Sequence, residues 1–422
     1  MAEERQLETL IIGAGTTGLL VAQGLKKAGL PFRIFEYESP STYQTRPREW
    51  GMTLHWGSEH VSKVLPPELV ARMSETYADP TVSPDAVTGL PIFNGKTGEQ
   101  IVEMKAEKPV RVSRKKLRNL FSEGVAVEYG KEVVDIQEAE VEEGGVKREK
   151  VRVVFKDGTD AVGDLVVGCD GARSRARECI VGKEKAELTD VPLSMFNFTS
   201  RFTAEQALEL RKLNPLFINA IHPDHGTMFW ISIQDAPDPS DPSTWLFQLL
   251  LSWTHNPLPA SQNTQEGRMA FFKKRASEYA EPWRSAGEWV KEDCRIPMDP
   301  GTYWGKAERW DNRGGRMTIA GDAAHPMTPH RGQGLNNALQ DAVHFSSAVA
   351  LAASGTKTLK EAIDDYDKEV LERGMLEMQI SLKQTMFIHN WETLMASPMV
   401  KLGMRQAKKE EAEAELNGGQ EE

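Results

Sequence analysis

The pattern of hydrophobic and polar positions near the N-terminus predicts a strand, a helix and a second strand. In LETLIIGAGTTGLLVAQGLKKAGLPFRIFEYESP, the apolar run from Leu10 to Ile12 is followed by glycines and then by helical periodicity from Leu19 to Ala28. A Gly-Leu-Pro break separates this helix from another apolar run, Phe32 to Phe35, which ends at Glu36. The segment therefore reads as one βαβ unit.

The middle of the chain has the two-residue alternation of β-strands. In EVVDIQEAEVEEGGVKREKVRVVFKDGTDAVGDLVVGCDG, three short alternating runs are broken at Glu-Gly-Gly and at Lys-Asp-Gly, which predicts a β-meander that leads into a buried strand, Leu165 to Val167. From Leu193 to Trp253 the pattern is again strand-like and rich in aromatic residues. This region is a candidate second domain.

Towards the C-terminus, RMTIAGDAAH predicts a short strand from Met317 to Ala320, and NNALQDAVHFSSAVALAAS and LKEAIDDYDKEVLERGMLEMQISLKQTM have helical periodicity. The charged end, from Arg405 to Glu422, is typical of a frayed helix or a disordered tail. The whole pattern predicts an α/β fold in which a sheet of strands is inserted in the middle of the chain.

Charge and cysteine content narrow the function classes. The 422 residues include 51 basic and 62 acidic side chains, a net charge of −11, and an acidic balance without a basic cluster argues against nucleic-acid binding. The three cysteines, Cys169, Cys179 and Cys294, show no zinc or CxxC spacing, which fits a reducing compartment. The acidic N-terminus lacks the features of a signal peptide, and no apolar run is long enough to span a membrane. We expect a soluble, cytoplasmic monomer or homodimer that binds small molecules.

The glycines of the first βαβ unit carry the chemistry of a dinucleotide site. Gly13, Gly15 and Gly18 form GxGxxG between a strand and a helix: the first permits the tight turn, the second lets a pyrophosphate approach the backbone, and the third allows close helix packing. The helix N-terminus favours the phosphates, and Glu36 would accept hydrogen bonds from the adenosine ribose. An acid at this place favours FAD or NAD over NADP, and the motif alone does not choose between them.

A second motif, DLVVGCDGARSRAR, ends a buried strand at Asp170 and Gly171. The Asp-Gly pair is also an ordinary turn, so the motif is weak alone. Arg173 and Arg177, with Ser174 between them, follow the turn and are placed to meet an anion.

A third motif, GDAAHPMTPHRGQGLN, admits two interpretations. Its two histidines, His325 and His330, near Asp322 suggest a metal, but no companion cluster of acids or cysteines lies nearby. Alternatively, Gly321 and Asp322 end a strand, and the segment from Gly332 to Asn336 starts a helix whose N–H groups can face a group that gains negative charge. The second interpretation is favoured, because a flavin makes that demand, and we expect no metal.

The three motifs, in this order and at these spacings, resemble the class A FAD-dependent monooxygenases, of the salicylate-hydroxylase-like and fungal secondary-metabolite type, over about residues 7 to 390. The resemblance implies a Rossmann-type FAD-binding domain with an inserted β-sheet substrate domain. It also implies that VSRKKLRNLF supplies a further FAD contact, Arg114. The implied cofactor residues are Gly13, Gly15, Thr17, Gly18, Glu36, Arg114, Asp170, Gly171, Gly321, Asp322, Gly332, Gly334, Leu335 and Asn336.

The same resemblance implies domain bounds and a reaction. Residues 1–75, 100–190 and 290–350 would form the FAD-binding domain, 76–99 and 191–289 the substrate domain, 351–404 C-terminal helices and 405–422 a charged tail. Only one complete dinucleotide fingerprint is present, so NADPH or NADH would bind transiently. The implied reaction inserts one oxygen atom of O₂ into an aromatic or other electron-rich secondary metabolite through a flavin C4a-hydroperoxide.

The residues of the substrate site are less clearly marked. In LSMFNFTSRF, strand alternation places Phe196, Phe198 and Phe202 on one face, and Asn197, Thr199 and Arg201 on the other. Arg201 is the candidate catalytic residue, since it could hold a phenolate or carboxylate, and an exposed edge-strand arginine is the equal alternative. His222 and His225 fit a solvated loop better than a site. Other candidates are Arg46, Arg48, Trp50, His55 and Trp56 near the flavin, where either tryptophan could instead be core, and His330 and Arg331 beside the ring.

Two other functions stay open. A flavin enzyme of the same fold could halogenate, cyclise or dehydrogenate, although CRIP at Cys294 to Pro297 shares only its last two residues with the halogenase Trp-x-Trp-x-Ile-Pro segment. A flavoprotein without redox turnover could instead bind partners through its charged tail, although a solvated tail needs no partner.

Overall fold

The computed structural model describes residues 7–46, 48–87, 89–105, 108–254, 258–398 and 400–401, and the side chains of residues 105 and 143 lie outside this description. The chain forms two compact units. Unit 1 contains the described residues within 1–76, 112–191 and 302–382, and unit 2 those within 77–111, 192–301 and 383–422. Unit 1 includes residues 351–382, which were expected in a separate helical segment. Unit 2 includes residues 100–111 and 290–301, which were expected in the FAD-binding domain. Residues 405–422, the expected tail, lie outside the described residues.

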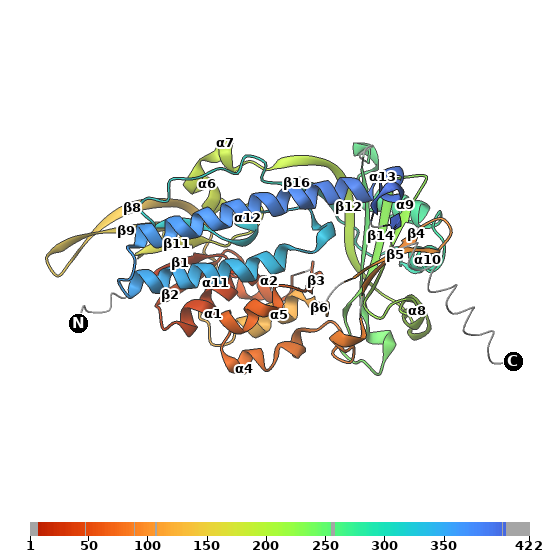
Figure 1. Ribbon diagram of the computed structural model, residues 1–422, viewed down its shortest axis with the longest axis horizontal. Coiled ribbons are helices and arrows are strands. Elements are labelled where there is room, and N and C mark those ends of the chain that lie inside the picture. The colour runs from red at the N-terminus through yellow and green to blue at the C-terminus, as the bar shows by residue number, and fades with distance from the viewer. Residues whose placement is uncertain are drawn as a thin grey trace. The chain divides into compact units, whose positions relative to one another are not determined.

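Unit 1 is built on a parallel sheet of five described strands (Figure 1). Its strands, in spatial order, are β17 (Met317–Ile319), β11 (Leu165–Gly168), β1 (Thr9–Ile12), β2 (Phe32–Glu36) and β7 (Val127–Tyr129). Every residue of β1 and β11 is buried, as expected for parallel strands that are covered on both faces. The predicted βαβ unit and the predicted strand before Gly321 are confirmed, and the order of strands brings the ends of β1, β11 and β17 side by side.

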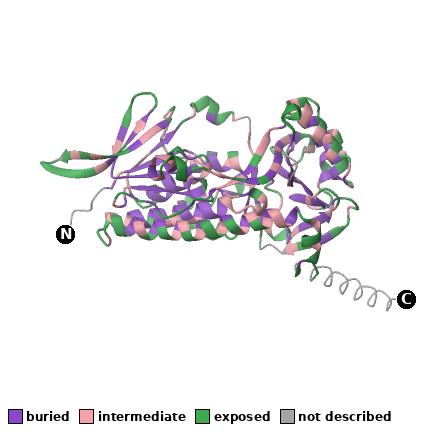
Figure 2. Cartoon of the chain, turned by 90° about the horizontal axis from the view of Figure 1, so that it is seen from above, coloured by how far each residue is buried: buried purple, intermediate pink, exposed green. Residues whose placement is uncertain are grey.

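Helices pack on this sheet, and α12 carries exposed residues along its outer side (Figure 2). The α1 helix lies close to α11, because a side chain on Gly24 would come within 2.2 Å of the Ser346 hydroxyl. Tyr366 of α12 donates a hydrogen bond to the Ile319 carbonyl at 3.1 Å and so ties the first part of α12 to β17. The helices with residues in unit 1 are α1 (Thr16–Lys27), α2 (Pro40–Gln44), α3 (Ser58–Val64), α4 (Pro67–Val70), α5 (Arg114–Phe121), α6 (Arg175–Val181), α7 (Lys183–Ala186), α11 (Gly334–Ala353) and α12 (Leu359–Ile388).

The predicted β-meander is confirmed as an antiparallel sheet in unit 1, in which β9 (Val146–Phe155) lies between β8 (Val133–Glu143) and β10 (Asp160–Gly163). A two-stranded sheet pairs β3 (Gly51–Leu54) with β6 (Val110–Ser113). No described helix is both long enough and apolar enough to cross a membrane.

Unit 2 contains a sheet of seven described strands in the order β16-β12-β15-β14-β13-β4-β5. The strands are β4 (Gly89–Asn94), β5 (Gln100–Lys105), β12 (Thr189–Arg201), β13 (Phe217–His222), β14 (Thr227–Asp235), β15 (Leu246–Thr254) and β16 (Met298–Tyr303), and β12 and β16 begin or end in unit 1. The helices are α8 (Ala204–Leu210), α9 (Gln265–Ala276), α10 (Trp283–Trp289) and α13 (Trp391–Ala396).

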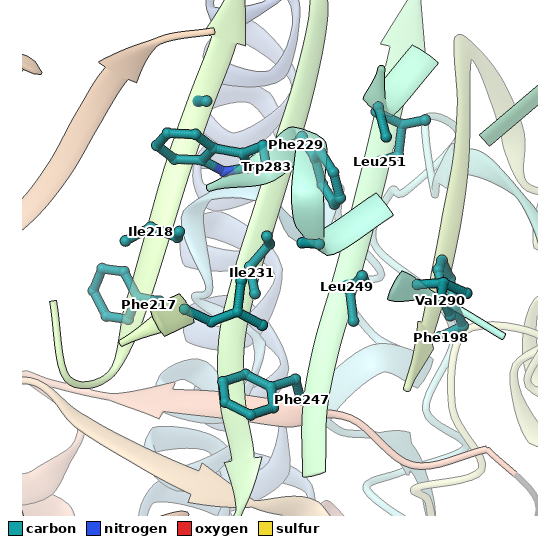
Figure 3. Close-up of a cluster of buried hydrophobic side chains, with 14 of the residues drawn as sticks. Phe198, Phe217, Ile218, Phe229, Ile231, Phe247, Leu249, Leu251, Trp283 and Val290 are labelled. Atoms are coloured by element: carbon teal, nitrogen blue, oxygen red, sulfur yellow. The ribbon is translucent and has the colours of Figure 1, made fainter. Parts of the chain in front are cut away.

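One face of this sheet forms the core of unit 2 (Figure 3). Phe198, Phe229, Ile231 and Leu249 are buried there, together with Trp283 from α10. Because side chains alternate along a strand, the residues between them point to the opposite face. The predicted alternation of β12 is confirmed: its phenylalanines are buried, whereas Asn197 and Thr199 are half-buried and Arg201 is exposed.

Candidate functional site

The glycine turn after β1 shows two glycines that the fold requires and one that it does not. Gly13 has φ +96°, and a Cβ there would lie 2.7 Å from the Cys169 carbonyl oxygen. A Cβ on Gly18 would lie 1.9 Å from the Gly13 carbonyl oxygen, so α1 could not pack at its observed distance. Gly15 has φ −71°, and a Cβ there would meet no atom within 4 Å. The space beside Gly15 is therefore open, as the approach of a ligand to the backbone requires.

The N-terminus of α1 is uncapped. Gly15 is the N-cap residue and no described side chain accepts a hydrogen bond from the first turn, so its N–H groups are available to an anion. Thr17, whose expected contact with the cofactor stays a prediction, packs its side chain against the loop after β17: a Cβ on Gly321 would lie 2.3 Å from the Thr17 hydroxyl oxygen. Thr17 thus holds two glycine loops together.

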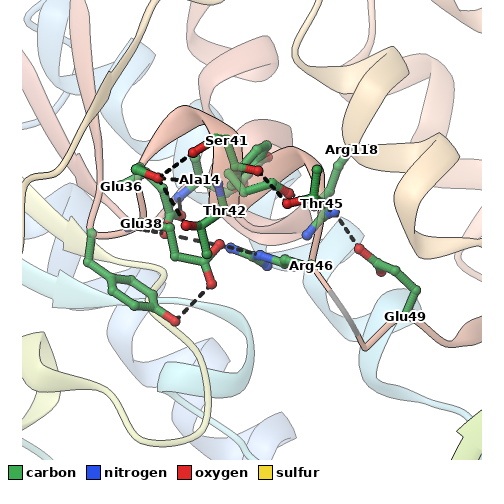
Figure 4. Close-up of polar contacts among 12 residues, drawn as sticks. Ala14, Glu36, Glu38, Ser41, Thr42, Thr45, Arg46, Glu49 and Arg118 are labelled. Carbon is green, nitrogen blue, oxygen red and sulfur yellow. Dashed lines mark hydrogen bonds and ion pairs between the residues drawn. The ribbon is translucent and has the colours of Figure 1, made fainter.

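Glu36 ends β2 directly beside the glycine turn (Figure 4). Its carboxylate is buried and accepts hydrogen bonds from the backbone N–H of Ala14 at 3.0 Å and of Glu38 at 3.1 Å. The guanidinium of Arg46 lies 3.6 Å away. Each carboxylate oxygen has a second lone pair, so the group keeps acceptors that ribose hydroxyls could use.

Arg118 of α5 is a site residue that the sequence motifs did not identify. Its side chain is buried, stacks over the Tyr43 ring at 4.7 Å and donates to the Glu49 carboxylate, while its Nε and Nη1 have no hydrogen-bond partner among the described residues. Tyr43 in turn donates to the Ala14 carbonyl at 2.6 Å, which links Arg118 to the glycine turn. An unpaired buried N–H costs about 1–3 kcal/mol or more when charged, so these donors point to an anionic ligand. The i, i+4 spacing to Arg114 was the available signal.

Arg114, the other arginine of this helix, lies over the Trp50 ring at 4.3 Å. Its Nη1 is 3.5 Å from a Glu49 carboxylate oxygen. Burial lowers the pKa of the Arg114 guanidinium from its ordinary value. Two arginines therefore face one carboxylate, which leaves a positive charge in excess in this part of unit 1.

The Asp170-Gly171 turn caps its own helix. The Asp170 carboxylate accepts hydrogen bonds from the backbone N–H of Arg175 at 2.7 Å and of Ala176 at 3.0 Å, and from the Ser174 hydroxyl. Burial raises the pKa of the Asp170 carboxyl. Gly171 has φ +83° and open space around it. The carboxylate of Asp170 is thus largely used by α6, while Gly171 leaves the turn accessible.

The expectation that the arginines after this turn meet an anion is wrong for Arg177. This side chain is buried, and it donates to three carbonyls, those of Ala172 at 2.7 Å, Ala323 at 2.9 Å and Ala186 at 3.2 Å. Its donors are directed to backbone oxygens, so it ties the Asp-Gly loop to the Gly-Asp loop. Arg173 is exposed and has no partner among the described residues.

Asp322, after β17, presents an unpaired carboxylate. Gly321 before it has φ +60°, and the Asp322 side chain is exposed and forms no hydrogen bond with a described residue. The protein atoms around it nevertheless raise the pKa of its carboxyl by desolvation. One of its oxygens lies 3.7 Å from the position that a Cβ on Gly334 would occupy, which places it beside the first turn of α11. Such an acceptor suits sugar or ribityl hydroxyls.

The histidine that suggested a metal, His325, is part of a buried ion-pair network. Its Nε2 lies 2.7 Å from Asp341, whose carboxylate also accepts from the Gly321 N–H at 2.6 Å and from Arg373. Burial alone would raise the pKa of the Asp341 carboxyl, but His325 and Arg373 hold it well below its usual range. The network thus anchors the Gly-Asp loop to α11 and α12. No group of three or more metal-ligating side chains occurs among the described residues.

The start of α11 offers backbone rather than side-chain donors. Gly332 has φ +63°, and Gln333 at the N-cap gives no side-chain cap, so the first-turn N–H groups are available. The side chains of Leu335 and Asn336, both expected at the cofactor, are buried. The Asn336 amide accepts from the N–H of His55 at 3.0 Å and of Gly57 at 3.1 Å, and donates to two carbonyls. The Asn336 side chain therefore positions the segment after β3, and its expected role at the cofactor stays a prediction for its backbone N–H.

The aromatic and basic residues expected near the flavin ring differ in their burial and in their partners. Trp56 is 40% exposed, which excludes a core role for it, and its indole N–H donates to Gln333 at 2.7 Å. The Nε2 of His55 is buried and has no hydrogen-bond partner in the part of the chain that the structure describes, and burial lowers the pKa of this imidazole. Arg331 forms an ion pair with Glu377 at 2.8 Å, so its charge is neutralised.

In unit 2, the candidate catalytic residue Arg201 is exposed at the end of β12 and donates to the Thr244 carbonyl. β12 is not an edge strand, because it lies between β16 and β15. The solvated-loop interpretation is wrong for His222, which is 1% exposed and hydrogen-bonded through Nε2 to the Glu278 carbonyl at 3.1 Å. The Tyr279 ring, which follows α9, lies edge-on to the His222 imidazole with centroids 5.1 Å apart, a contact that the local sequence does not reveal.

Comparison with known proteins agrees with this geometry. Residues 6–381 match the model of a family described as an FAD binding domain. The chain is 35% identical to the FAD-dependent monooxygenase cctM of Talaromyces islandicus over 94% of this chain and 96% of that protein. It is 36% identical to the FAD-dependent monooxygenase phnB of Penicillium herquei over 94% and 95%.

Solved structures share the fold. HpxO of Klebsiella pneumoniae in complex with FAD and uric acid has a TM-score of 0.69 at 18% identity, over 99% of this chain and 97% of that one. The 2,6-dihydroxypyridine-3-hydroxylase of Arthrobacter nicotinovorans has a TM-score of 0.69 at 14% identity, over 92% and 93%.

Proposed function

Because this chain belongs to the class A FAD-dependent monooxygenases, of the type found in fungal secondary metabolism, we propose that it inserts one oxygen atom of O₂ into an aromatic or other electron-rich metabolite at the expense of NAD(P)H. The enzyme is an oxidoreductase that uses FAD. The identity of the reductant, the route of oxygen transfer and the substrate class are the parts that we propose.

The observation that carries the proposal is a set of unused polar groups in unit 1 that match the parts of FAD. The uncapped start of α1, with the open space at Gly15, would hold the pyrophosphate, together with the unpaired N–H groups of Arg118. Glu36 would bind the adenosine ribose, and the unpaired Asp322 the ribityl chain. Arg114 would add positive charge beside them.

The uncapped start of α11 would face the flavin ring. Its backbone N–H groups from Gly334 to Asn336 are aligned with the helix dipole and stabilise negative charge. FAD, when bound, supplies electron transfer from the nicotinamide and oxygen activation, for which the expected route is a C4a-hydroperoxide. The role of the chain is to orient the ring, stabilise its reduced form and exclude water, and no side chain needs to act as a nucleophile.

The proposal has a direct test. Purified protein should be yellow and should bind FAD stoichiometrically, and a screen of phenolic and polyketide-like metabolites should find compounds that stimulate NADPH or NADH oxidation. Product formed under ¹⁸O₂ should carry one labelled oxygen atom. A protein that stays colourless with added FAD, or a product without the label, would contradict it.

The second candidate, a non-oxygenating flavin enzyme of the same fold, shares the FAD site and differs only in its chemistry. Substrate turnover that continues after strict removal of oxygen would favour this halogenase, cyclase or dehydrogenase alternative. The third candidate, partner binding through residues 405–422, makes a different prediction. Deletion of that tail would abolish association and leave NADPH oxidation unchanged.

Arg201 stays in the proposal as a candidate substrate residue, although its exposure and its Thr244 partner weaken that role. We expect Arg201→Ala to keep FAD. Loss of substrate-stimulated NADPH oxidation would retain Arg201 as a substrate contact, and unchanged oxidation would remove it.

A further inference from the structure

On the face of the unit 2 sheet opposite its core, four side chains on adjacent strands lie in one row. Asn197 on β12 is paired with Leu250 on β15, Leu250 with Trp230 on β14, and Trp230 with Asn219 on β13. Since directly paired residues point to the same face of a sheet, Asn197 and Asn219 flank the apolar and aromatic pair Leu250 and Trp230, and beyond Asn219 the row continues with Ile92 on β4. These four residues therefore combine a flat apolar surface with an amide on either side.

The Asn197 end is a fixed hydrogen-bond donor. Arg111, which is buried, donates to the Gln248 side-chain oxygen at 2.6 Å, and the Gln248 amide nitrogen donates to the Asn197 side-chain oxygen at 2.8 Å. The Asn197 oxygen is thus used as an acceptor, and no described residue accepts a hydrogen bond from its Nδ2. A chain of hydrogen bonds that starts at a guanidinium polarises each following donor. The Nδ2 group is accordingly suited to a carbonyl, phenolate or carboxylate oxygen.

The Asn219 end is an unpaired acceptor. Its side-chain oxygen is buried and accepts no hydrogen bond from a described residue. Unpaired buried polar atoms are rare in folded proteins, because the lost hydration is not replaced. A ligand hydroxyl that donates to this oxygen would remove that cost.

Trp230 between the two ends is held in place. Its ring stacks on Phe217 with centroids 4.6 Å apart and an interplanar angle of 17°, and the Arg111 guanidinium lies 5.7 Å from its centroid. The indole is half-buried and so keeps exposed surface. Three strand spacings of roughly 4.8 Å separate the backbones at the two ends, and the amide side chains shorten this distance to the length of two or three fused rings.

We propose that this row is the substrate-recognition surface, and that it selects a flat fused-ring compound with an acceptor oxygen at one end and a hydroxyl group at the other. The inference rests on the proposed function, since the bound ring compound would be the oxygen acceptor. Asn197, Trp230 and Asn219 are specificity residues, and Arg111 and Gln248 are positioning residues that act through Asn197. In this proposal, Asn197 makes the contact with the substrate oxygen that was expected of Arg201.

The test compares two probes, 6-hydroxy-2-naphthoate and 2-naphthoate, which differ only in the hydroxyl group. Their affinities for the FAD-loaded protein are measured by calorimetry without NAD(P)H, so that no turnover occurs. The wild-type protein should bind the hydroxylated probe on the order of tenfold more tightly, as one hydrogen bond to a buried acceptor predicts. In Asn219→Leu this ratio should fall to about one, and in Asn219→Asp, which keeps an acceptor, it should persist.

Asn197→Leu should weaken both probes on the order of tenfold and keep their ratio, since both carry the carboxylate. Ser194→Ala, on the same strand but on its alternate face, is the matched control and should change neither affinity. FAD content and far-UV circular dichroism check that each variant is folded. Failure of both probes to bind at millimolar concentration, equal affinities in the wild-type protein, or an unchanged ratio in Asn219→Leu would overturn the proposal.

This design separates the row from the reaction. Probe binding that follows the prediction in a protein that never incorporates labelled oxygen would leave the row standing and refute the proposed function. If the protein forms labelled product but Asn219→Leu leaves the ratio of the two probe affinities unchanged, the proposed function stands and the role of the row is refuted.

Discussion

Replacing Gly15 by alanine should weaken FAD binding without disturbing the packing of the protein. Gly15 has φ −71° and ψ −175°, which alanine adopts without strain, and a Cβ there meets no atom within 4 Å. Gly18, three residues along the same motif, is the matched contrast, because its Cβ would lie 1.9 Å from the Gly13 carbonyl oxygen. The two substitutions add the same methyl group, and only the second disturbs the fold.

The expected magnitudes differ accordingly. In the apoprotein, Gly15→Ala weakens the helix N-cap by about 0.5–1 kcal/mol, and the reduced freedom of the unfolded chain offsets this by about 0.4–1 kcal/mol. Its net effect on the free energy of unfolding is therefore below about 1 kcal/mol. In the complex, the methyl group holds the pyrophosphate away from the N–H groups, and one lost charge-assisted hydrogen bond of about 1.5–3 kcal/mol weakens FAD binding about 10- to 100-fold. Gly18→Ala forces α1 away from β1, at a cost of about 1–3 kcal/mol or more in stability.

The assay pairs urea unfolding of the FAD-free proteins with titration of FAD, followed by flavin fluorescence. Gly15→Ala should unfold at the wild-type urea midpoint and bind FAD weakly, whereas Gly18→Ala should unfold at a lower midpoint. Wild-type FAD affinity in Gly15→Ala would refute the inference that a phosphate approaches the backbone at this position. A wild-type midpoint in Gly18→Ala would refute the steric account of α1 packing.

Four further outcomes follow from groups in unit 1. Asp322→Ala should lose FAD on purification without lowering the apoprotein melting temperature, because its carboxylate has no partner among the described residues; a lowered apoprotein melting temperature would argue for a structural role. Arg118→Lys, which removes the two unpaired N–H groups, should weaken FAD binding on the order of tenfold in the same titration, and unchanged affinity would exclude a phosphate contact. Asp341→Asn, which breaks the buried pairs with His325 and Arg373, should cost about 3 kcal/mol in urea unfolding, and a loss below about 1 kcal/mol would contradict the network. Burial raises the pKa of Asp367 to about 7, so between about pH 4 and pH 7 the folded protein keeps a proton that the unfolded chain loses. The free energy of unfolding should therefore fall across this range by up to about 1.4 kcal/mol per pH unit. Asp367→Asn should reduce this decline, and an identical decline in the variant would refute the assignment.

The parts of the fold that the sequence predicted are those fixed by neighbours along the chain. The turn at Gly13 and the close packing at Gly18 follow from a glycine spacing of a few residues, and both are present in the structure as φ +96° and as a 1.9 Å approach to a hypothetical Cβ. Strand alternation likewise placed Asn197 and Phe198 on opposite faces of β12. Such patterns are local, so periodicity reveals them.

The side-chain roles that the sequence did not predict depend on partners far along the chain. Asn336 is bonded to the N–H of His55, 281 residues away, and Arg177 to the carbonyl of Ala323, 146 residues away. A polar residue next to a glycine motif reads as a ligand contact when its distant partners are unknown. The same distance hides Arg118, whose importance lies in two donors left unpaired after folding.

These contacts indicate that different groups of the cofactor site hold the loops in place and bind the cofactor. Buried polar side chains, among them Asn336, Arg177 and Asp341, bond to backbone groups of the loops and so fix where the first turns of α1 and α11 lie relative to the glycine turns. The groups left unused are main-chain N–H groups and a few side chains, of which Asp322 is one. Since the buried residues do not themselves supply the donors that face the cofactor, changes to these residues should affect FAD only by moving the loops. Such variants should lose stability and FAD affinity together, whereas Gly15→Ala should lose affinity alone.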